Sequence, residues 1–290
     1  MLRRQARLRR EYLYRKSLEG KEKEEYEKKR QVKQALAEGK PLPTELRAEE
    51  QQLRKEVELE DDNTAVVRTH VDDEYNKAGA RDPKVLITTS RDPSSRLKAF
   101  AKELKLVFPN SQRMNRGNQV IPQMVEAARS HDFTDIVLVQ EHRGEPDGMI
   151  ICHLPFGPTA YFGMYNTVLR HDIQDSEEIG TVSQANPHII MESFTSKLGQ
   201  RTSNILKYLF PCTKEESKRT VSFINKTDFI CFRHHCFEKD KESREVILKE
   251  QGPRFDLKLY QVKLGTLDQT WAENEWVLRP YHNSNKKQKL

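Results

Sequence analysis

Apolar residues occupy both faces of two extended stretches of this chain, and each stretch follows a Gly-Pro turn. Residues 251–266 read QGPRFDLKLYQVKLGT, where Gly252-Pro253 opens a strand and Gly265 closes it. A strand that is apolar on both faces is expected in the middle of a sheet. Residues 156–163, FGPTAYFG, repeat the turn and the apolar segment upstream, and the pair predicts an internal duplication. The alternative is an ordinary core strand whose lysines are solvated.

Strand and helix signals alternate from position 84 onward. Residues 85–89 predict a buried strand, and an apolar stripe of helical period follows as far as Pro109. Residues 135–139 and 148–152 predict two further strands. Strands that alternate with helices are typical of an α/β unit.

A second unit of the same kind follows. KELKLVFP, which ends at Pro109, matches SNILKYLFP, which ends at Pro211. FTDIVLVQEHRG matches KTDFICFRHHCF in the same way. Each half then reads strand, helix, Phe-Pro, Thr-Asp strand, Gly-Pro turn and strand. We therefore predict an α/β domain over residues 84–266, built from two similar halves at 84–170 and 188–266.

The N-terminal part of the chain is rich in charged, helix-forming residues. No continuous apolar stripe runs through residues 1 to about 38, so we predict a charged helical arm, over residues 1–60, whose first helix does not pack on its own domain. Residues 61–83 are predicted to be a linker. The arginine-rich start of the arm, which includes Arg3, Arg4 and Arg7, is a candidate for binding RNA phosphates. The alternative is a solvated helix or a disordered tail.

Composition supports this division of the chain. Of the 290 residues, 36% are hydrophobic and 32% are charged, and the net charge is +6, which is compatible with nucleic-acid binding. No apolar run approaches the length of a membrane-spanning helix, and the N-terminus lacks the apolar region of a secretory signal. The four cysteines are expected to be reduced, buried thiols of an intracellular protein. Residues 267–290 are expected to be a polar tail with a short helix over residues 268–276.

Several motifs between residues 83 and 266 carry a likeness to a known family. TTSRDPSSRLKAF, the following Arg-Gly loop, ICHLPFGPTAYF, NKTDFICFRHHCF and GPRFDLKLYQVKLGT together resemble the Brix domain of ribosome-assembly factors. The resemblance implies two duplicated α/β halves, each similar to the anticodon-binding domain of class II tRNA synthetases. It also implies RNA binding in the nucleus and nucleolus, without catalysis.

Within the Brix family, the arginine-rich N-terminus and the length are most similar to members that belong to the U3 small nucleolar ribonucleoprotein. This resemblance implies a component of the small-subunit processome, needed for early processing of precursor rRNA and for maturation of 18S rRNA. The implied partners are U3 small nucleolar RNA, precursor rRNA and other protein subunits of the U3 particle. Those subunits include its M-phase phosphoprotein scaffold and a small RNA-binding sister subunit. No membrane and no cofactor is implied.

Cys231, His234, His235 and Cys236 are the strongest candidates for metal or nucleophilic chemistry, but they lie on one predicted strand. Alternate residues of a strand face opposite sides, so Cys231 and His235 share one face and the other two share the opposite face. No second ligand pair with zinc-finger spacing and no GxxxxGK[ST] loop accompanies them. The sequence therefore predicts no catalytic residue, no metal site and no enzyme activity.

Arginines at predicted turns and strand ends remain as candidates for RNA binding. Guanidinium groups bind phosphate bidentately, and a glycine beside them permits close backbone approach. The alternative for Arg91 and Arg233 is an ion pair with an acid that holds the two halves together. Phe and Tyr near these arginines could stack on bases, but aromatic residues of the strands are expected to be core. The predicted RNA-binding residues of the domain are Arg91, Arg113, Arg116, Gly117, Arg233 and Arg254.

Two functions are compatible with this sequence. The first is a non-enzymatic RNA-binding assembly factor that recognises structured RNA through phosphate and shape. The second is a protein-interaction scaffold of a nucleolar particle with only incidental RNA contacts. An enzyme that acts on RNA is a third class, but no acid–base constellation supports it.

Overall fold

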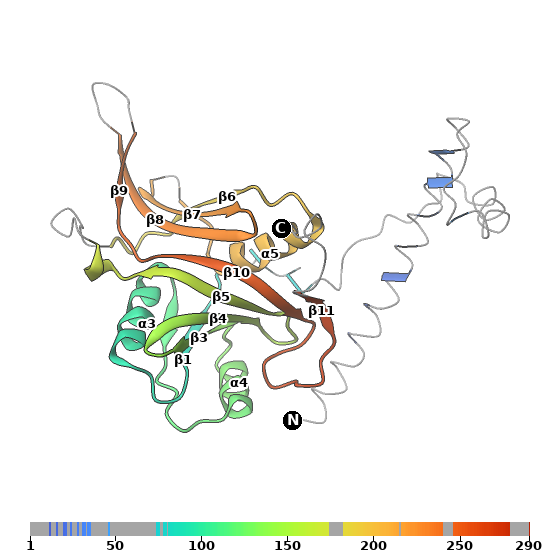
Figure 1. The fold of residues 1–290 in the computed structure, drawn as a ribbon, viewed down its shortest axis with the longest axis horizontal. Helices are drawn as coiled ribbons and strands as arrows, with labels where there is room; N and C mark the ends of the chain where they lie inside the picture. The colour runs from blue at the N-terminus through green and yellow to red at the C-terminus, as the bar shows by residue number, and fades with distance from the viewer. Residues whose placement is uncertain are drawn as a thin grey trace. The chain divides into compact units, whose positions relative to one another are not determined.

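The computed structural model describes residues 81–173, 182–214, 216–239 and 246–278 continuously, together with scattered residues before position 81 and Leu290. The chain divides into two units, Met1–Asn76 and Lys77–Leu290, and the second unit contains the sheet (Figure 1). Arg3, Arg4 and Arg7, with most of the predicted arm and linker, lie outside the described residues. The arm, the linker and the domain boundaries therefore stay predictions.

In the first half of the second unit, local sequence signals set where the helices begin and end. The first helix, α3, begins after Ser94, whose hydroxyl accepts the N–H of Leu97 at 3.1 Å, and it ends before Pro109. The elements of this half are β1 (Val85–Thr89), α3 (Ser95–Val107), β2 (Ser111–Arg113), α4 (Ile121–Ser130), β3 (Asp135–His142), β4 (Glu145–His153), β5 (Thr159–Val168) and the short 3-10 helix η2 (Arg170–Asp172).

The second half repeats the opening of the first. Its helix α5 begins after Ser196, whose hydroxyl accepts the N–H of Gly199 at 2.9 Å. The elements are β6 (His188–Glu192), α5 (Lys197–Lys207), β7 (Arg219–Lys226), β8 (Phe229–Lys239), β9 (Val246–Glu250), β10 (Arg254–Lys263) and β11 (Asn274–Val277). Among the described residues, no helix is long and apolar enough to span a membrane.

The strand order confirms the predicted duplication. The sheet runs β2-β1-β3-β4-β5-β10-β8-β7-β6, so the halves mirror each other about the antiparallel pair β5–β10. In each half the first strand pairs in parallel with the first strand of the antiparallel hairpin, β1 with β3 and β6 with β7. Figure 1 shows β5 and β10 side by side through the middle of the sheet. The central position predicted for residues 251–266 is therefore confirmed, whereas the likeness to tRNA synthetase domains stays a prediction.

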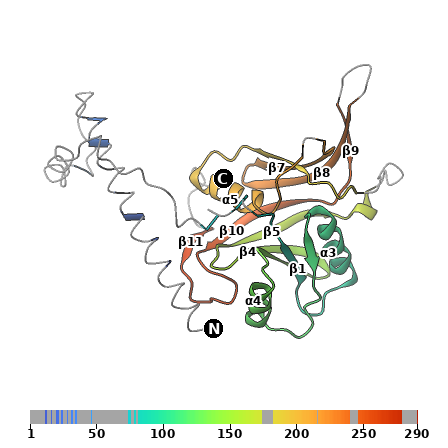
Figure 2. The same ribbon diagram turned by 180° about the vertical axis from the view of Figure 1, so that it is seen from behind.

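The two helices of the first half lie on opposite faces of the sheet. α4 packs on Leu86, Ile136, Leu138 and Ile150. Because strand residues alternate in direction, the buried residues between these positions face the other side, where α3 packs against β1 to β4. On that α3 face, Phe100 of α3 meets the ring of Phe255 of β10 edge-on, with centroids 5.7 Å apart. Figure 2 shows α3 and α5 with the sheet seen from behind.

The two Phe-Pro motifs meet at the junction of the halves. The rings of Phe108 and Phe210 lie 5.1 Å apart between centroids. Beside them, the buried guanidinium of Arg219 in β7 donates to the carbonyl oxygens of Leu106 at 2.5 Å and Val107 at 2.7 Å, at the end of α3. Five donors on a planar fork suit several carbonyls at once. Arg219 therefore ties the second half to the first.

Three sequence-based expectations are wrong in detail. Thr134-Asp135 leads into β3, but Thr227-Asp228 forms the turn before β8, which is the counterpart of β4 rather than of β3. The two strings matched because both describe a buried strand after a turn. No helix forms over residues 268–276, because Asn274–Val277 pairs with β10 as β11. All four cysteines are free, but only Cys152 is buried, and Cys212 is exposed.

Candidate nucleic-acid interface

The ends of parallel strands bring two predicted arginine loops to one edge of the sheet. β1 pairs in parallel with β2 and with β3, and the chain leaves these strands in the same direction. The N–H of Met114, just after β2, donates to the carbonyl of Ile87 in β1 at 2.9 Å. Arg91 follows β1, and Arg113 and Arg116 end or follow β2, so the three lie along one edge of the first half.

Arg91 and Arg116 are close enough to affect each other electrostatically. Partial burial lowers the pKa of Arg116, and the charge of Arg91 lowers it further. The Nε of Arg116 donates to the carbonyl oxygen of Gln119 at 3.3 Å, and Arg91 is exposed. Within the described part of the chain, neither has an ion pair with a carboxylate. Two neighbouring cations without a counter-ion raise the local potential and attract a polyanion.

Gly117 gives this edge an open backbone. It has a φ of +54°, and a Cβ built on it meets nothing within 4 Å. The conformation favours glycine, while the open space permits a bulky anion to approach the chain. Among the described residues, no carboxylate is a cause of the pKa shift of Arg116, the residue before Gly117.

Carboxylates occupy the neighbouring start of α3. The side chain of Glu141 accepts the backbone N–H of Ser94 at 2.9 Å and also its hydroxyl. Arg96, in the first turn, pairs with Glu145 at 2.8 Å and with Asp172 at 3.2 Å. The N-terminus of α3 is therefore already bonded to protein carboxylates, whereas Arg91 and Arg116 beside it have no carboxylate partner among the described residues.

A cavity of about 450 Å³ adjoins this edge. Its polar side is formed by Lys84, Arg113 and His131, and its apolar side includes Met114 and Phe133. The ammonium of Lys84 lies 4.5 Å from the centroid of the Phe133 ring and donates to the carbonyl of His131 at 2.9 Å. Arg113 is thus placed where a cationic edge meets an apolar hollow.

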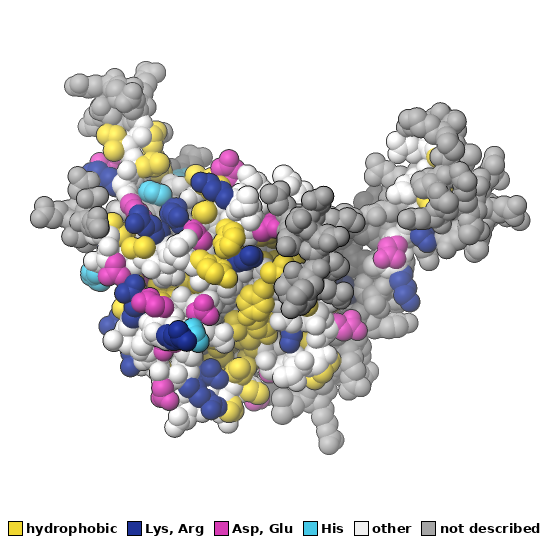
Figure 3. All heavy atoms as spheres, viewed as in Figure 1, with side chains coloured by type: hydrophobic (Ala, Val, Ile, Leu, Met, Phe, Trp, Pro, Cys, Tyr) yellow, Lys and Arg dark blue, Asp and Glu magenta, His cyan; other side chains and the backbone are white. Residues whose placement is uncertain are grey.

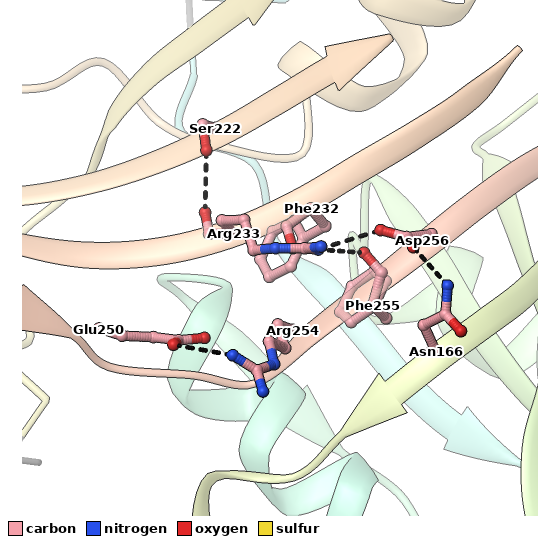
Figure 4. Close-up of polar contacts among 8 residues, drawn as sticks. All are labelled: Asn166, Ser222, Phe232, Arg233, Glu250, Arg254, Phe255 and Asp256. Atoms are coloured by element: carbon pink, nitrogen blue, oxygen red, sulfur yellow. Dashed lines mark hydrogen bonds and ion pairs between the residues drawn. The ribbon is translucent and has the colours of Figure 1, made fainter. Parts of the chain in front are cut away.

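Arg233 does not join this group. Its Nη1 donates to the carbonyl oxygens of Phe232 at 2.7 Å and Phe255 at 3.1 Å, and to Asp256 at 3.0 Å (Figure 4). Asp256 also accepts from the amide of Asn166, in the first half, at 2.8 Å. These contacts fit the alternative in which Arg233 holds the halves together. Its assignment to RNA binding stays a prediction.

Hydrogen bonds to Asp256 keep its carboxylate ionised. Burial raises the pKa of Asp256, but the bonds from Asn166 and Arg233 outweigh burial, and the pKa is lowered. Arg254, two residues before Asp256 on the same strand, pairs with Glu250 at 3.2 Å and is about two-fifths exposed (Figure 4). Arg254 can still reach solvent, but a protein acid already occupies one edge of its guanidinium.

The Cys-His run of β8 shows no metal-binding arrangement. His234 is buried: its Nε2 accepts from Arg219 at 2.8 Å, and its Nδ1 bonds the carbonyl of Gly252 at 2.7 Å. Both ring nitrogens are therefore used within the protein. Among the described residues, no group of three or more His, Cys, Asp or Glu side chains could hold a metal ion.

Sequence reasoning missed a set of surface aromatics and two structural arginines. Tyr165 and Tyr260 are 46% and 38% exposed on the central strands, although strand aromatics were expected to be core. The alternation of Tyr161, Gly163 and Tyr165 along one strand was the available signal. Arg129 of α4 bonds Asp268 at 3.3 Å and fixes the segment after β10, a contact between residues far apart in sequence.

Comparison with known proteins identifies the class. The Brix domain family model matches residues 90–261, which are most of the sheet described above. The chain therefore belongs to the Brix-domain family.

Relatives within that family are similar over the full length. The U3 small nucleolar ribonucleoprotein protein IMP4 of Rattus norvegicus is 55% identical over 99% of this chain and 98% of its own. The protein of the same name from Schizosaccharomyces pombe is 47% identical over 97% of this chain and 96% of its own. Among solved structures, a probable ribosomal biogenesis protein from Aeropyrum pernix K1 aligns with a TM-score of 0.45 and 16% identity, covering 61% of this chain and 96% of that one.

Proposed function

We propose that this chain is an RNA-binding ribosome-assembly factor of the U3 small nucleolar ribonucleoprotein. The observation that carries the proposal is identity of 47–55%, over nearly the whole of both chains, with proteins named for that particle. As a component of the small-subunit processome, the chain acts in early processing of precursor rRNA and in maturation of 18S rRNA. It works in the nucleolus, by binding rather than by catalysis.

The edge formed by Arg91, Arg113 and Arg116 supplies the RNA contact in this proposal. Guanidinium groups recognise phosphate oxygens in pairs, and the open backbone at Gly117 permits a phosphate to approach. Contacts of this kind recognise the course of an RNA backbone rather than base identity. U3 small nucleolar RNA and precursor rRNA are the proposed ligands.

The protein partners in this proposal are other subunits of the U3 particle. They include its M-phase phosphoprotein scaffold and a small RNA-binding sister subunit. One structural feature favours a protein contact: Val246, Ile247 and Leu248 of β9 are each more than half exposed. Three adjacent exposed apolar residues on a strand are a common protein-docking surface. The exposed apolar residues of β9 are the observation that favours the alternative function, a scaffold with incidental RNA contacts.

Substitution of the arginine edge tests the proposal. Arg91→Gln, Arg113→Gln and Arg116→Gln combined are expected to weaken binding of the full chain to U3 RNA by about tenfold or more, because three phosphate contacts are lost. Fluorescence anisotropy at fixed salt measures the Kd. The matched control replaces Lys98, Lys102 and Lys105, on the exposed side of α3, by glutamine. It removes the same charge elsewhere.

The two functions predict different results. An RNA-binding factor loses affinity in the arginine variant and keeps most of it in the lysine control. A scaffold shows equal, small losses in both, and ultraviolet crosslinks confined to the charged arm. Equal affinity of a folded arginine variant and the wild-type chain would contradict the RNA-binding edge.

A further inference from the structure

Four aromatic side chains form two pairs on the open face of the central strands. Tyr161 of β5 and Tyr260 of β10 have ring centroids 5.9 Å apart, and Tyr165 of β5 and Phe229 of β8 have centroids 5.4 Å apart. Figure 3 shows hydrophobic side chains gathered over this part of the sheet. We call these four residues the aromatic platform.

The aromatic platform is exposed because of the difference between the two halves. Tyr161 packs at the border of the cluster under α4, so the aromatic platform lies on the face that α4 covers in the first half. The second half has no counterpart of α4 among its described residues. Over β5, β10 and β8, no described helix covers the face that α4 shields over β1, β3 and β4, and Tyr165 and Tyr260 are exposed there.

Gly163 leaves room for the ring of Tyr165. Gly163 lies between Tyr161 and Tyr165 on the same face of β5 and pairs with Lys258. A Cβ at Gly163 would lie 3.3 Å from the Cε2 atom of Tyr165, so the absence of a side chain lets that ring lean over the strand. From there it reaches Phe229 across β10. The rings thus lie across the sheet instead of projecting singly into water.

One lysine ammonium lies close to a ring of each aromatic pair. The ammonium of Lys258 is 4.6 Å from the centroid of the Phe229 ring, and that of Lys263 is 5.8 Å from the centroid of the Tyr161 ring. Burial raises the pKa of Tyr161 to about 12, and the pKa of Tyr260 is also raised, by burial and then by Asp147. Both hydroxyls are therefore uncharged at neutral pH and do not repel phosphate. Asp147 adjoins Tyr260, and Asp256, which pairs with Tyr165 across the strands, is a second acid beside the aromatic platform, already bonded to Asn166 and Arg233.

We infer that the aromatic platform is a stacking site for unpaired bases of single-stranded RNA, with Lys258 and Lys263 contacting the phosphates. Every base offers a π face, so aromatic rings bind single strands without a strict sequence requirement. Tyr161 and Tyr165 lie four residues apart on one strand, roughly 13 Å. The two pairs can thus hold different nucleotides of one short segment. This inference rests on the proposed function, because it assigns a second RNA contact to the same chain.

The chemistry of the face favours RNA over an apolar protein surface. The platform side chains are aromatic rather than aliphatic, and a cation accompanies each pair. Both features complement a strand of stacked bases joined by phosphates. The most exposed aliphatic residues of the domain, Val246, Ile247 and Leu248, lie instead on β9.

Aromatic-to-leucine substitution tests the inference. Tyr165→Leu with Tyr260→Leu keeps apolar area but removes two π faces, while Tyr165→Phe with Tyr260→Phe keeps the rings. Each full-length protein is titrated by fluorescence anisotropy with oligouridine of about 12 nucleotides and with an RNA duplex of similar length. The leucine variant is expected to bind oligouridine at least about tenfold more weakly and the duplex unchanged. The phenylalanine variant is expected to bind both as the wild-type chain does.

Each other outcome overturns the stacking site. If the leucine variant binds oligouridine with wild-type affinity, the aromatic platform is not a stacking site. Equal losses for oligouridine and duplex indicate general electrostatics, and losses in the phenylalanine variant indicate hydroxyl contacts. Unchanged RNA binding with lost recovery of U3-particle proteins indicates protein docking. A wild-type chain that binds neither RNA contradicts the proposed function as well, whereas the other results contradict the stacking site alone.

A second measurement covers the case in which the leucine variant does not fold. Oligouridine that contains 4-thiouridine is crosslinked to the wild-type chain, and the modified peptides are located by mass spectrometry. Crosslinks at Tyr161, Tyr165, Phe229 or Tyr260 support the inference. Crosslinks only at other positions overturn it.

Discussion

In the first half of the domain Arg91, Arg113 and Arg116 lie in or beside loops after parallel strands, whereas in the second half Arg219 and Arg233 lie within strands β7 and β8. Arg219 donates to carbonyl oxygens at the end of α3, and Arg233 bonds Asp256. The first group has no carboxylate partner among the described residues.

The difference shows that position, not residue type, decides what an arginine does here. A side chain within a sheet is surrounded by strands that supply carbonyl and carboxylate acceptors, and burial makes those bonds necessary. A side chain beyond the strand ends meets water, so its charge remains available to a ligand. The RNA-binding edge is therefore expected where the strands end.

The largest effect is expected at Arg219. Arg219→Met leaves the carbonyls of Leu106 and Val107 and the Nε2 of His234 without their donor. We expect the free energy of unfolding to fall by about 3–5 kcal/mol, measured by urea denaturation. Arg96→Met, which removes half-exposed ion pairs, is the control and is expected to cost about 1 kcal/mol or less. Similar values for the two variants would contradict the role of Arg219 between the halves.

A second test compares salt dependence. The arginine edge variant, with Arg91, Arg113 and Arg116 replaced by glutamine, is expected to reduce the slope of log K against log salt by about 2–3, since each phosphate contact contributes about 0.7–0.9. Binding to U3 RNA is measured over a series of salt concentrations. Arg233→Gln is expected to leave this slope unchanged and to lower stability instead. If Arg233→Gln also reduces the slope of log K against log salt, Arg233 contacts RNA phosphate and the second half takes part in RNA binding.

The third test measures how stability depends on pH. Burial, and then the charge of Arg219, lowers the pKa of His234 to about 3, against about 6.5 in an unfolded chain. Between these values the unfolded chain binds a proton that the folded chain does not, so stability is lost as pH falls from about 6.5 toward 3. His234→Gln is expected to flatten this part of the curve of thermal midpoint against pH. His142→Gln, at an exposed site, is expected to keep it.

The smallest effect is expected at Arg254. Its ion pair with Glu250 is half-exposed, so Arg254→Gln is expected to change the free energy of unfolding by about 0.5 kcal/mol or less. Its effect on U3 RNA affinity is expected to be smaller than that of the arginine edge variant. A tenfold loss of affinity from this single substitution would place Arg254 among the main phosphate contacts.

The sequence predicted the main elements of each half and their order, but not β11. The helical stripe before Pro109, the repeat before Pro211 and the two-faced strand after Gly252-Pro253 are signals carried by neighbouring residues, and α3, α5 and β10 appear where those signals lie. The duplication followed from the order of these signals. The match of the Thr-Asp strings failed, because a short apolar string does not distinguish the two strands of one hairpin.

Only the tertiary structure decided which candidate residues are available. Arg233 meets Asp256 because β8 pairs with β10, and Arg219 meets Leu106 because the two halves close on each other. Likewise, Tyr165 and Tyr260 are exposed because no described helix covers the centre of that face. Local periodicity determines an element from its own residues, whereas the partners and exposure of a side chain depend on strands distant in sequence.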